Sequence, residues 1–312
     1  MLSYNPTALE RGVRAAFWHF YNSAPTSYVD RLATRVSSNG TDEKYAWIGH
    51  PPQMGAVTDE IEFTPLSDAS YTLENLLYGA GIEIRRSVLA DDRTGDLLGQ
   101  IRRLANVARM HPNKLLIDAL INGTSTTVDG LSNTCYDGVA FFSASHPARG
   151  RQSSTQSNLH SGAGVTVANL KTDIGAVIAK LAGFLAENNE PINETMTKLE
   201  IVCHPTLMAN FNEAIYASII SNTSNVGNRD FQISILPTAR LSDTDDWFML
   251  NVTDAGDRPL IFQEREPLEF LALDTPTSGD DAFDREVYKW KTRYRAAAGY
   301  AHWAKAVKVT NS

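Results

Sequence analysis

The chain has 312 residues, 43 % hydrophobic and 21 % charged, so it can bury a sizeable core as one large domain or two interlocked ones. Its formal net charge of −8 argues against a surface that binds nucleic acid through many basic phosphate contacts. With two cysteines, no signal-peptide pattern and no apolar run of membrane-spanning length, it is expected to be a soluble cytoplasmic product without disulfides.

The N-terminal region predicts two short helices that have little core of their own. The first covers residues 7–21 and has apolar side chains at helical spacing, among them Phe17 and Phe20. The second covers residues 28–36. Because both helices carry few apolar residues, we expect them to lie on the rest of the chain or on a neighbouring chain.

The segment from Tyr45 to about Tyr78 predicts an extended loop. It contains several prolines and glycines and no clear core periodicity, although "EIEFT" and "SYTLENLLY" within it are strand-like. A segment this long without its own core typically serves as a lid, a binding loop or an assembly arm. A half-buried strand is then expected in "GIEIRRSVLA".

The longest helical pattern covers residues 93–122. Pro112 lies inside it and predicts a kink or a one-residue break, because proline lacks an N–H group and collides with the preceding turn. A Ser-, Thr- and Gly-rich loop over residues 124–165 follows. The next amphipathic helix is expected over residues 167–187, with Thr166 as its cap.

The remaining chain predicts strands around one further helix. "KLEIVCH" indicates a buried strand, and Pro205 is suited to begin the helix after it. A long strand is expected from Glu286 to about Ala297, preceded by four shorter ones: "FQISILP", "WFMLNV", "RPLIFQE" and "LEFLAL". Because strands and helices do not alternate regularly, the predicted fold class is α+β.

The stretch richest in chemical groups is "CYDGVAFFSASHPARG", residues 135–150. A Cys/His nucleophilic pair requires a nearby base and a thiol with a depressed pKa. Cys135 lies in a turn-forming run, Pro147 confines His146 to extended backbone, and nothing local orients the imidazole toward the thiol. These features favour an ordered loop with a small buried thiol over a cysteine-dependent hydrolase.

No metal or cofactor pattern is found either. The seven histidines are scattered without paired spacing, and "GAGIEI" lacks the third glycine of a dinucleotide fingerprint. The acidic run "SDTDDW", residues 242–247, fits a solvated turn better than a weak calcium site. We therefore predict no catalytic, cofactor-binding or metal-binding residue.

Five separated stretches, in this order, resemble the major head subunit family of Mu-like phages and prophages: "YAWIGHPPQM", "IEIRRSVLADDRTGDL", "ARMHPNKLLIDALING", "TCYDGVAFFSASHP" and "KTRYRAAAGYAHWAKAVKV". The resemblance covers the chain from about residue 10 to its end. One departure is that "GAVTDEIEF" stands where the family usually has an Arg-Glu-Trp cluster. The resemblance implies the tailed-phage major capsid fold, also called the Johnson fold.

The resemblance also implies regions that reach other subunits. The N-arm would wrap a neighbour, and the E-loop would reach across an adjacent subunit. The implied inter-subunit contacts are Phe17, Phe20, Trp47, Ile48, Met54, Ile61, Phe63 and Leu66. The implied regions are an N-arm (1–45), an E-loop (46–80), a peripheral domain with a long spine helix (81–123), an axial domain (124–282), and a return strand to the peripheral domain with the chain end (283–312).

The implied function is that of a non-enzymatic major capsid protein. It would self-assemble through hexamers and pentamers into an icosahedral head shell around packaged double-stranded DNA, without specific DNA binding and without a membrane. Assembly would take place in the host bacterial cytoplasm with a portal, a separate scaffold, a head protease and a decoration protein, and the product would be the virion capsid. Two alternatives stay open: a nanocompartment shell of the same fold around a cargo enzyme, and the cysteine-dependent hydrolase.

Overall fold

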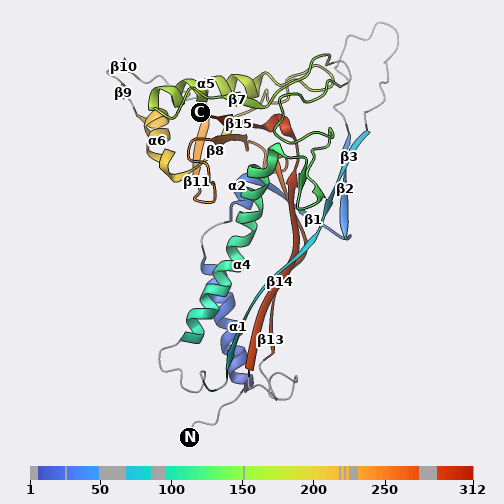
Figure 1. Ribbon diagram of the computed structural model, residues 1–312, viewed down its shortest axis with the longest axis vertical. Helices are drawn as coiled ribbons and strands as arrows, with labels where there is room; N and C mark the ends of the chain where they lie inside the picture. The colour runs from blue at the N-terminus through green and yellow to red at the C-terminus, as the bar shows by residue number, and fades with distance from the viewer. Residues whose placement is uncertain are drawn as a thin grey trace.

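A computed structural model of the chain describes residues 6–24, 27–48, 68–85, 87, 96–149, 152–217, 219–220, 223–224, 231–273 and 287–311. The molecule has an elongated body and a broader body at one end of it (Figure 1). Two helices and a four-stranded sheet form the elongated body, and two helices and a five-stranded sheet form the broader one. Within the described residues, no helix is both long and apolar enough to cross a membrane.

The four-stranded sheet has the order β1-β13-β14-β4, with β1 parallel to β13 and the other pairs antiparallel. The two strands predicted as "RPLIFQE" and "LEFLAL" are one strand, β13, whose register shifts between Glu264 and Glu269. Pro267 lies in this irregularity, which tolerates its missing N–H donor. The strands are β1 (Ala33–Ser37), β4 (Leu76–Arg85), β13 (Leu260–Leu273) and β14 (Val287–Tyr300).

The helix predicted over residues 28–36 is wrong beyond its first turn. Helix α2 (Val29–Leu32) has only four residues, and β1 begins directly after it. The backbone of β1 pairs with β13 from Leu260 onward. The β-branched residues Thr34 and Val36 suit a strand, and the sheet supplies their backbone partners.

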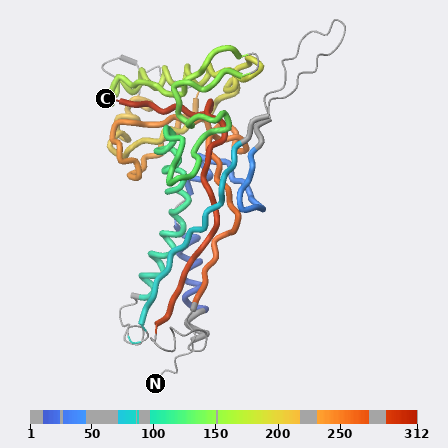
Figure 2. Tube along the Cα trace, turned by 45° about the vertical axis from the view of Figure 1, so that its right-hand side comes forward, coloured from blue at the N-terminus to red at the C-terminus, as the bar shows by residue number. Residues whose placement is uncertain are grey.

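Helices α1 (Pro6–Ser23) and α4 (Asp96–Ile121) pack on one face of this sheet (Figure 2). The ring of Phe17 on α1 stacks on that of Phe270 on β13, with 4.4 Å between their centroids. The buried apolar residues of this smaller core are Val13, Phe17, Leu97, Ile101, Leu104, Ala105, Ala108, Phe270, Tyr288 and Trp290. The N-terminal helix therefore lies on its own subunit.

Helix α4 continues through Pro112, so the one-residue break, one of the two outcomes predicted there, does not occur. Its first half contributes Ile101 and Leu104 to the smaller core, and its second half contributes Leu116 and Ile117 to the larger core of the broader body. Burial of several apolar side chains on both sides of the proline outweighs the loss of one backbone hydrogen bond.

The five-stranded sheet has the order β11-β8-β12-β15-β7 and carries α5 and α6 (Figure 1). The predicted cap of α5 is confirmed, because the hydroxyl of Thr166 accepts from the N–H of Asn169 at 3.3 Å. The helix ends at Ala182, earlier than predicted, and Gly183 follows. The elements are β7 (Leu159–Ser161), α5 (Val167–Ala182), β8 (Lys198–Cys203), α6 (Met208–Tyr216), β11 (Gln232–Pro237), β12 (Trp247–Asn251) and β15 (Ala306–Thr310).

Shorter elements connect these parts. Strands β2 and β3 form an antiparallel hairpin. The base of this hairpin lies on the elongated body, and its other end projects from it. Pro205 begins a 3-10 turn that leads into α6, one turn earlier than the α-helix itself. The remaining elements are β2 (Asp42–Ile48), β3 (Asp68–Glu74), η1 (Asn122–Thr124), β5 (Thr127–Val128), β6 (Leu131–Ser132), η2 (Pro205–Leu207), β9 (Ile219–Ile220), β10 (Thr223–Ser224) and η3 (Trp303–Lys305).

An ion pair with a buried carboxylate and a partly exposed guanidinium joins the N-terminal region to the broader body. The guanidinium of Arg31 on α2 contacts the carboxylate of Glu200 on β8 and also donates to the carbonyl of Ile235 at 3.2 Å. Glu200 is only 4 % exposed. Burial raises the pKa of Glu200, and the charge and hydrogen bond of Arg31 oppose that rise.

We expect Arg31→Met to lower the free energy of unfolding by about 2–3 kcal/mol at pH 7, because it leaves a buried carboxylate without its counter-charge. With its folded-state pKa raised, Glu200 takes up a proton more readily in the native than in the unfolded protein. The deficit should therefore be largest above that pKa and shrink as pH falls through it. Urea denaturation at several pH values measures this.

The matched control is Arg35→Met, because Arg35 is half exposed and pairs with Glu264 at 2.8 Å on the surface. It should cost less than about 1 kcal/mol. A second comparison is the double variant Arg31→Met/Glu200→Gln, which should recover part of the loss. Equal losses for the two arginine variants would contradict this account of the buried pair.

Candidate functional site

The loop that follows α4 contains the cysteine, aspartate, serine and histidine side chains that could take part in a reaction. Its start is fixed at Asn122 and Gly123, where a Cβ on Gly123 would lie 2.6 Å from the ring of Phe142. The side chain of Asn133 donates to the carbonyls of Asn122 and Ser125, both at 2.9 Å. The Asn-Gly pair therefore ends the helix and lets the loop fold back closely over it.

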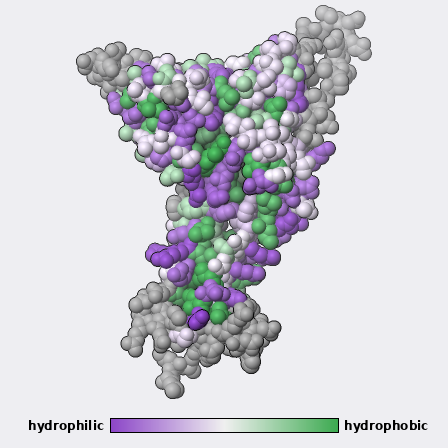
Figure 3. All heavy atoms as spheres, in the orientation of Figure 1, coloured by the Kyte–Doolittle hydropathy of each residue, from purple (hydrophilic) through white to green (hydrophobic). Residues whose placement is uncertain are grey.

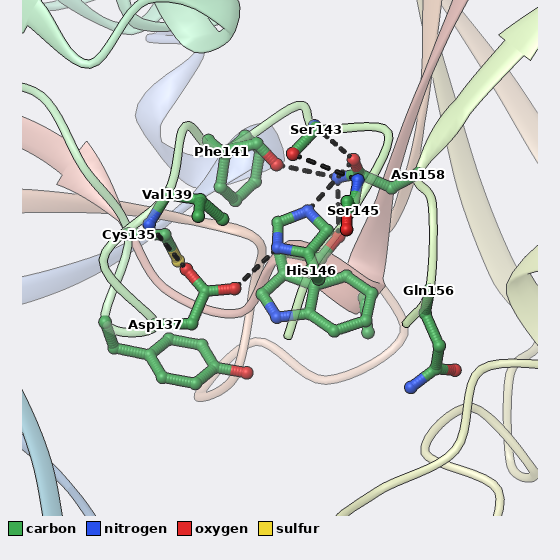
Figure 4. Close-up of polar contacts among 12 residues, drawn as sticks. Cys135, Asp137, Val139, Phe141, Ser143, Ser145, His146, Gln156 and Asn158 are labelled. Carbon is green, nitrogen blue, oxygen red and sulfur yellow. Dashed lines mark hydrogen bonds and ion pairs between the residues drawn. The ribbon is translucent and has the colours of Figure 1, made fainter. Parts of the chain in front are cut away.

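His146 lies at the centre of this loop (Figure 4). Its Nδ1 is 2.5 Å from Oδ2 of Asp137, and its Nε2 is 3.1 Å from Oδ1 of Asn158. The imidazole also stacks on the indole of Trp303, with 3.9 Å between ring centroids and 6° between ring planes. The side chains of His146 and Asp137 are 0 % and 2 % exposed.

The orientation of Asn158 determines which atoms donate. Its amide nitrogen donates to the carbonyls of Phe141 at 2.7 Å and Trp303 at 3.2 Å, and its oxygen accepts from the N–H of Ser143 at 2.8 Å. The amide oxygen therefore faces His146, and both ring nitrogens of that imidazole face acceptors. The imidazole is therefore held on both sides, by the carboxylate of Asp137 and by the amide of Asn158.

The thiol of Cys135 is not activated. It is 1 % exposed and donates to the carbonyl of Ala301 at 3.6 Å. Burial, followed by the charge of Asp137, raises the pKa of this thiol far above its ordinary value. Because both nitrogens of His146 are engaged elsewhere, the structure confirms the prediction of a small buried thiol and does not form a Cys/His nucleophilic pair.

A pocket of about 30 Å³ lies beside this network, with Tyr136, Arg149, Glu187, His302 and Trp303 among its lining residues. The guanidinium of Arg149 is 5.7 Å from the ring centre of Tyr136. The volume is sufficient for about one water molecule. The network therefore holds the loop against the turn at Trp303 rather than receiving a substrate.

The acidic run at residues 242–247 forms a hydrogen-bonded turn. The carboxylate of Asp243 accepts from the N–H groups of Asp245 and Asp246 at 3.0 and 3.1 Å. Asp246 pairs with Lys308 at 3.1 Å and accepts from the backbone of Asn311. Among the residues that the structure describes, no group of three or more potential metal ligands converges.

The eight predicted inter-subunit residues fall into three groups. Phe17 is fully buried against its own subunit, which corrects its expected contact with a neighbour, whereas Phe20 is only partly buried, under the guanidinium of Arg102 at 5.0 Å. Trp47 and Ile48 belong to β2. The remaining four lie outside the described residues: Met54, Ile61, Phe63 and Leu66.

The β2–β3 hairpin rests on the face of the long sheet that points away from α4. The rings of Tyr45 and Tyr71 stack, with centroids 5.5 Å apart, and the hydroxyl of Tyr71 donates to the carbonyl of Tyr300. A Cβ at Gly299 would lie 2.9 Å from Leu73. This glycine therefore allows β3 to cross β14 closely. Strand β2 was not predicted as a strand, although its sequence "DEKYAWI" alternates as a strand does.

Comparisons with known proteins agree with this architecture. The family model described as Mu-like prophage major head subunit gpT matches residues 7–172 and 223–312. The Mu-like prophage FluMu major head subunit of Haemophilus influenzae is 24 % identical over 72 % of this chain and 70 % of its own. The major capsid protein of Escherichia phage Mu is 22 % identical over 97 % and 72 %.

Solved structures show the tailed-phage major capsid fold. The procapsid of bacteriophage JBD30 aligns with a TM-score of 0.57 and 18 % identity over 98 % of this chain and 75 % of that chain. The JBD30 capsid decorated with minor capsid protein trimers aligns with 0.50 and 13 % over 92 % and 64 %. The virus-like particle of Pyrococcus furiosus aligns with 0.55 and 8 % over 96 % and 98 %. This fold is α+β, as the sequence predicts.

We expect His146→Gln to lower the free energy of unfolding by about 2–4 kcal/mol, because the buried carboxylate of Asp137 would lose its hydrogen-bond partner and Trp303 would lose the stacked ring. The double variant Asp137→Asn/His146→Gln also replaces the buried carboxylate by a neutral amide and should lose less. Urea denaturation measures each value. The control His19→Gln changes an exposed imidazole and should stay within about 0.5 kcal/mol. If His146→Gln behaves like His19→Gln, the network does not hold the loop.

Both thiols should be unreactive in the folded protein. Cys203 is fully buried, and burial raises its pKa to about 12; Cys135 is shielded in the same way. Ellman's reagent at pH 8 should therefore titrate neither thiol in the native protein and both after denaturation in guanidinium. Rapid reaction of one thiol under native conditions would show that it is accessible and ionised.

Proposed function

The chain belongs to the family of Mu-like prophage major head subunits (gpT) and is a major capsid protein of a phage head shell, and from that premise we propose how the subunit is organised for assembly. The protein is structural and not an enzyme. In our proposal the elongated body is the peripheral domain, with α4 as its spine helix, and the broader body is the axial domain. The β2–β3 hairpin is the stem of an E-loop that reaches an adjacent subunit.

The hairpin is the observation that carries this proposal. All seven residues of β2 pair with β3, and the pair projects from the body on the side away from α4 (Figure 1). Trp47 and Ile48 are at its outer end and stay candidate contacts, as does the partly buried Phe20. For the N-arm we propose a neighbour contact that does not use Phe17, because that side chain already fills a site on its own subunit.

Apolar side chains that stay exposed on the elongated body support contact with neighbours. Figure 3 shows apolar groups among polar ones along this body. Leu77 of β4 is 61 % exposed, and α4 exposes Leu98 and Val107. Exposed apolar groups that gather on one part of a surface are typical of protein–protein contacts.

For the shell we propose hexamers and pentamers of this subunit in an icosahedral arrangement around double-stranded DNA. The net charge of −8 supports an inner wall that does not bind the duplex tightly. The JBD30 capsid is decorated with minor capsid protein trimers, which supports a decoration partner for this chain too. A portal, a separate scaffold and a head protease complete the proposed set of partners.

The test replaces residues 50–66 by a Gly/Ser linker of equal length. This leaves β2, β3 and the Tyr45–Tyr71 stack in place, whereas a longer replacement would remove a strand that packs on β14. We expect a folded subunit with an unchanged urea midpoint and at least about a tenfold loss of particle yield by negative-stain electron microscopy, because the contacts made by this segment would be lost at every subunit. Normal assembly of this variant contradicts an inter-subunit role, and unfolding would place the segment in the core.

A further inference from the structure

The hairpin is attached to the long sheet at both of its ends. Strand β1, at one edge of the sheet, leads into β2, and β3 leads into β4 at the opposite edge. The hairpin therefore straddles the two middle strands, β13 and β14. Its angle to the sheet depends on what fills the space at its base.

That space holds Gln263, a side chain of β13 that is 0 % exposed. Its amide nitrogen donates to Oδ1 of Asn75 at 2.7 Å and to the carbonyl of Leu73 at 3.3 Å. Its amide oxygen accepts from the hydroxyl of Tyr45 at 2.6 Å. One buried side chain of the sheet thus binds both strands of the hairpin and the residue that joins β3 to β4.

Asn75 extends the network to the turn before β2. Its amide nitrogen donates to the hydroxyl of Ser38 at 2.9 Å and to the carbonyl of Gly40 at 3.1 Å. The carboxylate of Glu43 then accepts from Ser38 and from the N–H groups of Asn39 and Gly40. These hydrogen bonds lower the pKa of Glu43. A buried network with its groups satisfied in this way favours one geometry over its neighbours.

We propose that Gln263 and Asn75 are positioning residues that hold the hairpin at one angle to the sheet, and that this angle sets the curvature at which subunits meet. The claim about curvature rests on the proposed function of the hairpin as an inter-subunit arm. Seven residues of strand span about 24 Å, so a tilt of about 10° at the base displaces the outer end by about 4 Å. Such a displacement breaks hydrogen bonds and apolar contacts that the outer end makes.

The first experiment needs no assembly. Spin labels on Lys44→Cys of β2 and Arg103→Cys of α4 report the angle as a distance distribution in the unassembled full chain, because the native thiols are buried. We expect Gln263→Leu to broaden this distribution to at least twice its wild-type width. The matched control is Asn193→Leu, which removes a buried amide that donates to Leu181 and Ala304 in the broader body. It should destabilise the fold and leave the distribution unchanged.

The second experiment measures particle diameters by electron microscopy for the same variants without labels, at a temperature where near-UV circular dichroism shows each to be folded. Gln263→Leu should give a broad range of diameters or open sheets, and Asn193→Leu the wild-type diameter. An unchanged label distribution in Gln263→Leu overturns the positioning role. A broadened distribution with normal particles overturns the link to curvature. The label distances decide the positioning role whether or not the unmodified chain forms particles without its partners.

Discussion

Tyr300 lies where the two bodies of the subunit meet, and it contacts segments on both sides. Its ring stacks on that of Phe141, with 4.5 Å between centroids and 11° between planes, and its hydroxyl donates to the carbonyl of Ala119 on α4 at 2.8 Å. At this point β14 leaves the long sheet, and the chain continues through η3 into β15 of the other sheet. Through contacts of this kind the larger core extends from the broader body to the adjoining end of the long sheet.

Helices and strands whose own apolar residues define the buried face could be predicted from the sequence. Helices α4 and α5 and strand β8 carry continuous apolar stripes, and their type is correct. The errors occur where a segment distant in sequence decides the secondary structure. Residues 33–37 form strand β1 because β13 lies beside them. Strand β13 continues across Pro267 because the register shift at this point tolerates the proline. Strand β15 was missed as a separate element, since only the sheet around it reveals its role.

The absence of an activated thiol could be argued from sequence, but the reason for the chemical groups in the loop could not. Asp137, His146 and Asn158 form an arrangement that, on an open surface, would suggest acid–base chemistry. In the folded protein these side chains are buried against Trp303, where they hold the loop in place. Nothing in the spacing of these residues indicates that Asn158 would turn its oxygen toward the imidazole. The hydrogen bonds of Gln263 could not be predicted either, because its partners Tyr45, Leu73 and Asn75 are far from it in sequence.

The pairing of Asn75 with Gln263 also has a consequence for timing. These residues are 188 positions apart, so the base of the hairpin cannot close until most of the chain has left the ribosome. Contacts this distant in sequence form late in folding. An incomplete nascent chain therefore lacks the hydrogen bonds at the base of the hairpin, and β2 and β3 take up their position on the long sheet only once β13 has been made.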